Sequence, residues 1–329
     1  MHPLPITIAA GRYDRTAPLH DGRVVPEGLD VTWLQLNPEQ VFFRMIQHRE
    51  FHASEMALAS FVILRDRGDT DFVGVPAFLS RAFRHDTIYV SNKSTITRPE
   101  DLKGKRVGVP EYQMTTAVWL RATLEEDYGV APEDMTWLQG SLEQPGRVVH
   151  TPVAPKGVSL TGIESHQTLA RMLEAGEIDA LISPRMPSTF RVESPDVRRL
   201  WDDPWTVERE YYRRTKLFPI MHMVVVRSEV VKANPWIPAT LLNAFTAAKQ
   251  MAEADLRDPT ALRSGVPFLV EQYEATVREM GPDYWAYGVE QNRRDLEEYI
   301  RISLRQGLIE KPIAVDDMFP ESTRRTSKI

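Results

Sequence analysis

The chain has 329 residues, of which 42% are hydrophobic and 26% charged, with a formal net charge of −6 and no cysteine. This length predicts about two domains of ordinary size, each large enough to bury a core. The absence of cysteine excludes disulfide bonds, cysteine-ligated metals and thiol nucleophiles. The weakly acidic balance gives no reason to expect nucleic acid or an anionic membrane as a partner.

The N-terminal residues are expected to form a strand rather than a targeting signal. Pro3, Pro5 and Thr7 interrupt the apolar stretch, and no Lys or Arg precedes it, whereas a secretory signal needs a basic start and an unbroken apolar segment. No window approaches the roughly 18 apolar residues that a membrane span needs. We therefore expect a cytoplasmic protein.

Strand and helix patterns alternate along the chain, which predicts an α/β architecture with largely parallel sheets. Asn37 followed by Pro38 marks the start of a helix, because Asn caps helices and proline fits the first helical position. The other elements expected before residue 91 are strands at 6–10, 29–36, 55–59, 72–78 and 86–90, and a helix at 61–67.

The alternation continues beyond residue 99. A helical turn from Pro99 precedes a strand that ends at Val109, and Thr115 and Thr116 are expected to cap a long helix. Residues 141–166 are rich in Pro, Gly and polar residues, which predicts a long loop. The remaining expected elements are helices at 169–175, 267–280 and 293–306, strands at 178–182 and 221–226, and a helix that opens at Asn234 and Pro235.

An internal similarity suggests two lobes. Residues 30–36 (DVTWLQL) recur as 134–140 (DMTWLQG), which fits two similarly wound halves or a chance likeness of amphipathic strands. Strands that resume the first pattern after residue 220 predict a discontinuous lobe one of residues 1–88 and 222–329, and a lobe two of residues 89–221. Each lobe would be a doubly wound mixed sheet, and two crossovers between the lobes would leave a cleft suited to a ligand.

Arginines gather at the strand ends that would face this cleft. Arg15, Arg84 and Arg185 each follow an expected strand, and Thr115 stands at a helix N-terminus. Guanidinium groups match carboxylates, and helix N-termini attract anions, so a small carboxylate is the expected ligand. For each arginine taken alone, a solvated or lobe-bridging salt bridge is the alternative.

The candidate acid–base groups lie near the crossovers. His85 and His222 are placed there, and Glu55 opens an apolar run in which an unpaired carboxylate would be costly to bury. Asp14 lies near two arginines and suits either a salt bridge or a base. A metal site formed by these four residues is an alternative without diagnostic spacing, and we expect none. The chain has no dinucleotide, P-loop, zincin or hydrolase motif.

Several segments of the chain resemble known protein families. Residues 101–109 (DLKGKRVGV) and 173–181 (LEAGEIDAL) resemble the second-lobe opening and a later segment of type II periplasmic-binding-protein folds. More specific segments are 13–16 (YDRT), 42–45 (FFRM), 54–56 (SEM), 83–85 (FRH), 109–114 (VPEYQM), 183–185 (SPR), 210–215 (EYYRRT), 218–222 (FPIMH) and 287–293 (YGVEQNR). These segments, in order from about residue 6 to 310, resemble the 4,5-dihydroxyphthalate decarboxylase family.

The resemblance implies conversion of 4,5-dihydroxyphthalate to protocatechuate and CO2, with a small aromatic carboxylate as partner. Each ring carboxylate has a hydroxyl para to it, so acid–base chemistry suffices and we expect no cofactor. A tightly held departing carboxylate would stabilise the ground state. We therefore expect Arg15 and Arg185 to hold the retained carboxylate, and Phe83 and Met114 to face the departing one.

The remaining roles are expected as follows. His85 or His222 protonates the ring carbon, since an imidazole can do so at neutral pH. Glu55 or Asp14 orients that histidine or accepts the phenolic proton. Further substrate contacts are expected from Arg84, Tyr112, Gln113 and Thr115.

Two other functions would use the same arginines. One is a cytoplasmic solute-binding protein for a small aromatic carboxylate, and the other is another lyase on the same fold. The apolar C-terminal helices are compatible with a homo-oligomer.

Overall fold

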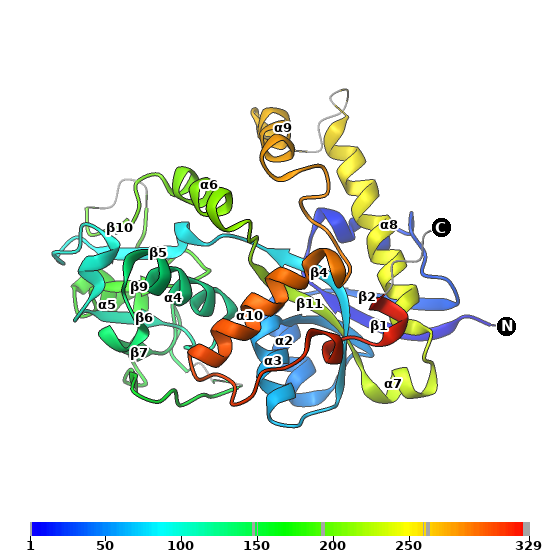
Figure 1. The fold of residues 1–329 in the computed structure, drawn as a ribbon, viewed down its shortest axis with the longest axis horizontal. Helices are drawn as coiled ribbons and strands as arrows, with labels where there is room; N and C mark the ends of the chain where they lie inside the picture. Colours follow the sequence, from blue (N-terminus) through cyan, green and yellow to red (C-terminus); the bar gives the residue numbers. More distant parts are fainter. Residues whose placement is uncertain are drawn as a thin grey trace.

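The computed structural model describes residues 2–146, 149, 151–191, 195–258, 260 and 264–324. The strands in these residues form two mixed sheets, which lie in two lobes side by side (Figure 1). We call the part built on the five-stranded sheet the first lobe and the part built on the six-stranded sheet the second lobe. Helices and strands alternate along the chain, as the α/β prediction requires.

The first sheet combines strands from distant parts of the chain. Its order is β2-β1-β3-β11-β4, formed by β2 (Leu29–Gln35), β1 (Leu4–Ala10), β3 (Ala53–Ala57), β11 (Ile220–Arg227) and β4 (Phe72–Arg81). Strands β1, β2 and β3 are parallel, whereas β11 is antiparallel to both neighbours. The chain leaves this lobe after β4 and returns at β11. These two strands lie side by side in the sheet and run in opposite directions.

The second sheet also combines parallel and antiparallel strands. Its order is β10-β5-β9-β6-β7-β8, formed by β10 (Val197–Arg199), β5 (Ile88–Ser91), β9 (Ala180–Ile182), β6 (Arg106–Val109), β7 (Thr136–Gln139) and β8 (Ser159–Gly162). The repeated sequence occupies equivalent places, because Trp33 of β2 pairs with Ile8 of β1 and Trp137 of β7 pairs with Val107 of β6, both in parallel. Residues 141–166 are not wholly loop, since β8 lies within them.

The helices pack around these sheets (Figure 1). One long helix of the first lobe, α8, begins at Ile237 rather than at Asn234, because the short α7 ends just before that residue. The helices of the first lobe are α1 (Ala17–His20), α2 (Pro38–His48), α3 (Leu58–Asp66), α7 (Ser228–Ala233), α8 (Ile237–Arg257), α9 (Leu269–Met280), α10 (Arg293–Arg305) and α11 (Glu321–Arg324), and those of the second lobe are α4 (Thr115–Tyr128), α5 (Leu169–Ala175) and α6 (Pro204–Thr215).

Two helix starts test the capping predictions. The side chain of Asn37 accepts a hydrogen bond from the Glu39 N–H at 3.1 Å, so it caps α2 as expected. Thr115 and Thr116 do not cap α4, whose N-cap residue is Met114. The Thr115 hydroxyl instead accepts from the Ala59 N–H at 3.2 Å, a contact between the lobes.

The core extends across both lobes. Residues 115–124 of α4 are buried on every side, and Trp119 packs against Tyr299 of α10 with ring centroids 5.5 Å apart. Helix α10 follows the return of the chain to the first lobe, yet it packs against α4 of the second lobe. None of the helices among the described residues is long and apolar enough to cross a membrane.

Candidate functional site

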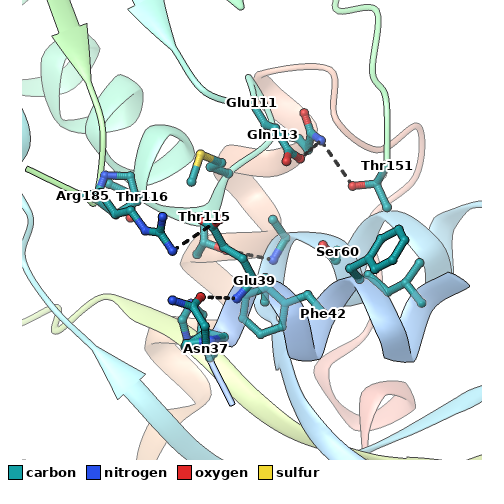
Figure 2. Close-up of a pocket in the computed structure, with 18 of the residues that line it drawn as sticks. Asn37, Glu39, Phe42, Ser60, Glu111, Gln113, Thr115, Thr116, Thr151 and Arg185 are labelled. Carbon is teal, nitrogen blue, oxygen red and sulfur yellow. Dashed lines mark hydrogen bonds and ion pairs between the residues drawn. The ribbon is translucent and has the colours of Figure 1, made fainter. Parts of the chain in front are cut away.

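A cavity of about 460 Å³ lies between the two lobes. The first lobe contributes the start of α2, the end of β3, the start of α3 and His222 of β11, and the second lobe contributes the β6–α4 connection and the residues after β9 (Figure 2). The described lining residues are Asn37, Pro38, Glu39, Gln40, Phe42, Phe43, Ile46, Ala57, Ala59, Ser60, Arg84, Glu111, Gln113, Met114, Thr115, Thr116, Thr151, Pro184, Arg185 and His222. The site thus lies beyond the carboxyl ends of parallel strands, where α/β sheets bind ligands.

His222 and Glu55 form a hydrogen-bonded pair at the cavity wall. His222 Nδ1 lies 2.7 Å from Glu55 Oε1, and the two residues lie on neighbouring strands, β11 and β3. The Glu55 side chain is fully buried, whereas His222 retains 18% of its side-chain surface and lines the cavity. With Nδ1 engaged, Nε2 is the ring nitrogen that can meet a ligand.

Two further donors hold the Glu55 carboxylate. The Gly11 N–H donates to Oε2 at 2.8 Å, and the Tyr13 hydroxyl donates to Oε1 at 2.5 Å. Burial by itself raises the pKa of the Glu55 carboxyl, but the hydrogen bonds from His222, Tyr13 and Gly11 outweigh it, so its pKa is lowered. Burial raises the pKa of Tyr13 far above its ordinary value, so this residue keeps its proton and remains a donor.

Arg84 brings a guanidinium to the cavity. It lies at the crossover between β4 and β5 with a φ of 78°, a conformation that residues other than glycine rarely adopt. The residue is half-buried, and its Nε is buried without a hydrogen-bond partner among the described residues. Burial lowers the pKa of Arg84, and the nearby Asp86 and Glu208 offset this effect only in part. A half-buried cationic fork that lines a cavity is suited to an anionic ligand.

Arg185 lies on the rim of the same cavity. Its side chain is half exposed, and its guanidinium lies 3.6 Å from the carboxylate of Glu39, the ion pair drawn across the cavity in Figure 2. Such exposed pairs are weak, so a carboxylate ligand could replace Glu39 as the partner.

Polar residues of the second lobe line another side of the cavity. Gln113 Nε2 donates to Glu111 Oε2 at 2.8 Å and to Thr151 Oγ1 at 3.4 Å. All three residues are buried, and Thr115 lies between them and Arg185 in Figure 2. The predictions for Gln113 and Thr115 therefore agree with their positions at the cavity.

Asp14 and Arg15 do not line this cavity. Arg15 donates to the Leu79 carbonyl and stacks on the rings of Tyr13 and Trp285, with its guanidinium carbon 4.3 Å and 4.1 Å from the centroids. The Asp14 side chain is 58% exposed and pairs with Arg15. Arg15 thus packs on the ring of Tyr13 outside the cavity. The positions of Asp14 and Arg15 do not support the substrate contacts expected for them.

His85 and Tyr112 are also held elsewhere. His85 packs against Trp201 and Tyr211 and faces a separate hollow of about 340 Å³. Burial, aided by Arg214, lowers the pKa of His85 to about 4, so its ring is uncharged at neutral pH and is a poor general acid. Tyr112 is fully buried, with the Arg121 guanidinium carbon 3.6 Å from its ring centroid.

The cavity also contains residues that the sequence analysis did not select. Phe42 fits the helical apolar pattern of a core residue, but its ring lines the cavity and meets the His222 ring edge-on at 4.9 Å. Asn37, Glu39, Ser60 and Thr151 carry no motif that distinguishes them from cap or loop residues. Glu111 lies within the VPEYQM segment, two residues before Gln113, and this proximity was the one available signal. Phe83 packs on Phe218 instead of lining the cavity.

The residues considered for a metal site do not meet. Glu55 and His222 are in contact, whereas Asp14 is on the surface and His85 lines the other hollow. Among the described residues, no three His, Asp or Glu side chains gather closely enough to hold a metal ion.

A comparison with known proteins places the chain in a family. Over its full length it is 38% identical to a 4,5-dihydroxyphthalate decarboxylase of Comamonas testosteroni, which it also covers completely. The chain belongs to the 4,5-dihydroxyphthalate decarboxylase family. A second member of this family, from Pseudomonas putida, is 41% identical over 65% of the chain and 83% of its own length.

Further comparisons concern the fold of this chain. Residues 26–144 match a family model described as NMT1/THI5 like. The periplasmic aliphatic sulphonate binding protein of Escherichia coli superposes over 98% of this chain and 99% of its own, with a TM-score of 0.53 and 13% identity. The chain therefore has the two-lobed fold of type II periplasmic binding proteins.

Proposed function

We propose that the chain is a carboxy-lyase that converts 4,5-dihydroxyphthalate to protocatechuate and CO2 without oxidation. The observation that carries the proposal is the His222–Glu55 pair in a cavity that is also lined by Arg84, whose Nε has no hydrogen-bond partner among the described residues. The name of the full-length relative supplies the substrate. We further propose that the enzyme acts in the cytoplasm.

The reaction requires a proton on the ring carbon that bears the departing carboxylate. A protonated His222 donates it from Nε2, while Glu55 stabilises the imidazolium through Nδ1. The C–C bond to the carboxylate then breaks, its electron pair restores the aromatic ring, and CO2 leaves. General acid catalysis of this kind contributes about 10²- to 10⁴-fold to the rate.

The cationic groups fix the substrate without opposing the loss of CO2. Arg84 binds the retained carboxylate, assisted by Arg185 on the rim, because only that charge persists through the reaction. The departing carboxylate lies against the less polar wall formed by Phe42 and Met114, close to His222. Phe42 takes the place that Phe83 holds in the sequence-based prediction.

Two matched histidine variants test the proposal. The purified protein is incubated with 4,5-dihydroxyphthalate, and CO2 and protocatechuate are followed for the wild type, His222→Gln and His85→Gln. We expect equal amounts of both products from the wild type, a fall in kcat of about 10²-fold or more for His222→Gln, and little change for His85→Gln. Thermal stabilisation by the acid without release of CO2 would instead identify a binding protein.

A further inference from the structure

The proposed reaction leaves one proton without an acceptor. The hydroxyl para to the departing carboxylate must give up its proton, at least partly, for electron density to reach the carbon that His222 protonates. Glu55 cannot serve, because it is buried behind His222 and already accepts three hydrogen bonds. Asp14 is on the surface and does not line the cavity.

Two other carboxylates line the cavity among the described residues, and they differ in their surroundings. Glu39 lies 3.6 Å from Arg185, on the side where the carboxylates of the substrate are expected. Glu111 lies across the cavity in the cluster with Gln113 and Thr151. A carboxylate only accepts hydrogen bonds, so the Gln113 amide must present its nitrogen to Glu111 and thereby fixes the carboxylate in place.

The distribution of charge across the cavity matches the substrate. On the first lobe, Tyr13 and His222 both form a hydrogen bond with Glu55, and Arg84 and Arg185 line the same cavity as His222. Figure 2 shows Gln113 and Thr151 on the side away from Arg185. The two carboxylates of 4,5-dihydroxyphthalate likewise occupy one edge of the ring, and the two hydroxyls occupy the opposite edge.

We infer that Glu111 is the base that accepts the phenolic proton, and that Gln113 positions it; the inference rests on the proposed function. The O–H bond para to the departing carboxylate breaks, its proton passes to Glu111, and the electron pair moves into the ring as the ring carbon takes a proton from His222. After CO2 leaves, Glu111 returns its proton to the phenolate oxygen. One proton from solvent restores His222, so the dianionic substrate yields CO2 and a monoanionic product.

Glu111→Gln is the decisive variant, and Glu50→Gln, which changes an exposed carboxylate paired with Arg44 outside the cavity, is its matched control. Turnover of 4,5-dihydroxyphthalate is measured together with calorimetric binding of phthalate, which has both carboxylates but no hydroxyl. We expect kcat of Glu111→Gln to fall about 10²- to 10⁴-fold, while its affinity for phthalate stays within about twofold of the wild type. Glu50→Gln should leave kcat unchanged, and Glu111→Asp should recover part of the lost kcat.

The outcomes separate the inference from the proposed function. If the wild type forms no protocatechuate, the proposed function fails. If the wild type is active and Glu111→Gln keeps its kcat, Glu111 is not the base, although the decarboxylase proposal stands. Loss of phthalate binding together with turnover would show that Glu111 maintains the cavity instead of acting on the hydroxyl edge.

Discussion

Replacement of Glu55 by Gln tests how far the buried carboxylate activates His222. The Glu55 carboxylate accepts hydrogen bonds from His222 and Tyr13 on one oxygen and from Gly11 on the other. An amide keeps one acceptor and gains a donor. Its nitrogen must therefore face either the Gly11 N–H or the Tyr13–His222 side, and at least one buried donor loses its partner.

The magnitude follows from these contacts. An unsatisfied buried donor costs about 1–3 kcal/mol of stability. Loss of the charged partner removes about 1.5–3 kcal/mol from the imidazolium form, which corresponds to a fall in kcat of about 10- to 150-fold. The pKa of Glu55 is lowered in the folded protein. Its contribution to stability is therefore present above its unfolded pKa of about 4.3 and is lost as the pH falls through the folded value.

The assay combines turnover of 4,5-dihydroxyphthalate with urea unfolding at several pH values. Glu50→Gln, which changes an exposed carboxylate paired with Arg44, provides the control. We expect Glu55→Gln to lose kcat and stability at neutral pH and to show a weaker decline in stability below about pH 4 than the wild type. A variant that keeps kcat within about twofold of the wild type would refute the role assigned to the pair.

Three further predictions concern other groups. Arg84→Met should raise KM for 4,5-dihydroxyphthalate by about 10- to 100-fold without loss of stability in thermal unfolding, because the guanidinium Nε is buried without a hydrogen-bond partner among the described residues; an unchanged KM would contradict its role as the anchor. Burial raises the pKa of Glu208 to about 7, so its contribution favours folding below about pH 4.5 and declines as the pH rises through 7. The effect of Glu208→Gln on the free energy of unfolding should therefore be about 3 kcal/mol more stabilising at pH 8 than at pH 4, measured by unfolding of both proteins at both pH values. Gly74→Ala should destabilise by about 1–3 kcal/mol, because its Cβ would lie 2.6 Å from the Met318 carbonyl oxygen, whereas Gly162→Ala has nothing within 4 Å and should be neutral in the same unfolding assay.

Much of the architecture followed from local pattern. Apolar runs predicted most strands to within a few residues, and Asn37 with Pro38 predicted the start of α2. The edge strand β8 was missed because its exposed, polar sequence lies among Pro and Gly residues that are typical of loops. The helix start at Asn234 was misplaced, because a short helix, α7, ends just before this residue and α8 begins only at Ile237.

The site was harder to predict, because its members come from both lobes. Position at a strand end selected His222, Arg84 and Gln113, which line the cavity, but by the same rule it selected Asp14 and Arg15, which do not. What separates these groups is the direction of each side chain once the strands twist and the lobes meet. Phe42 shows the converse error, since an apolar residue on a helix face is indistinguishable from core until the neighbouring lobe is in place.

The sequence by itself determined the α/β class, the exclusion of cysteine-dependent chemistry, and the family. These three properties depend on composition, periodicity and the order of motifs along the chain. Only the tertiary structure shows which histidine faces the cavity between the lobes. His85 and His222 are equivalent by position at a crossover, yet His85 is buried among aromatic rings beside a separate hollow, whereas His222 faces the cavity with a buried carboxylate behind it. The difference is one of solvation and partner geometry, which arises only when strands distant in sequence become neighbours in a sheet.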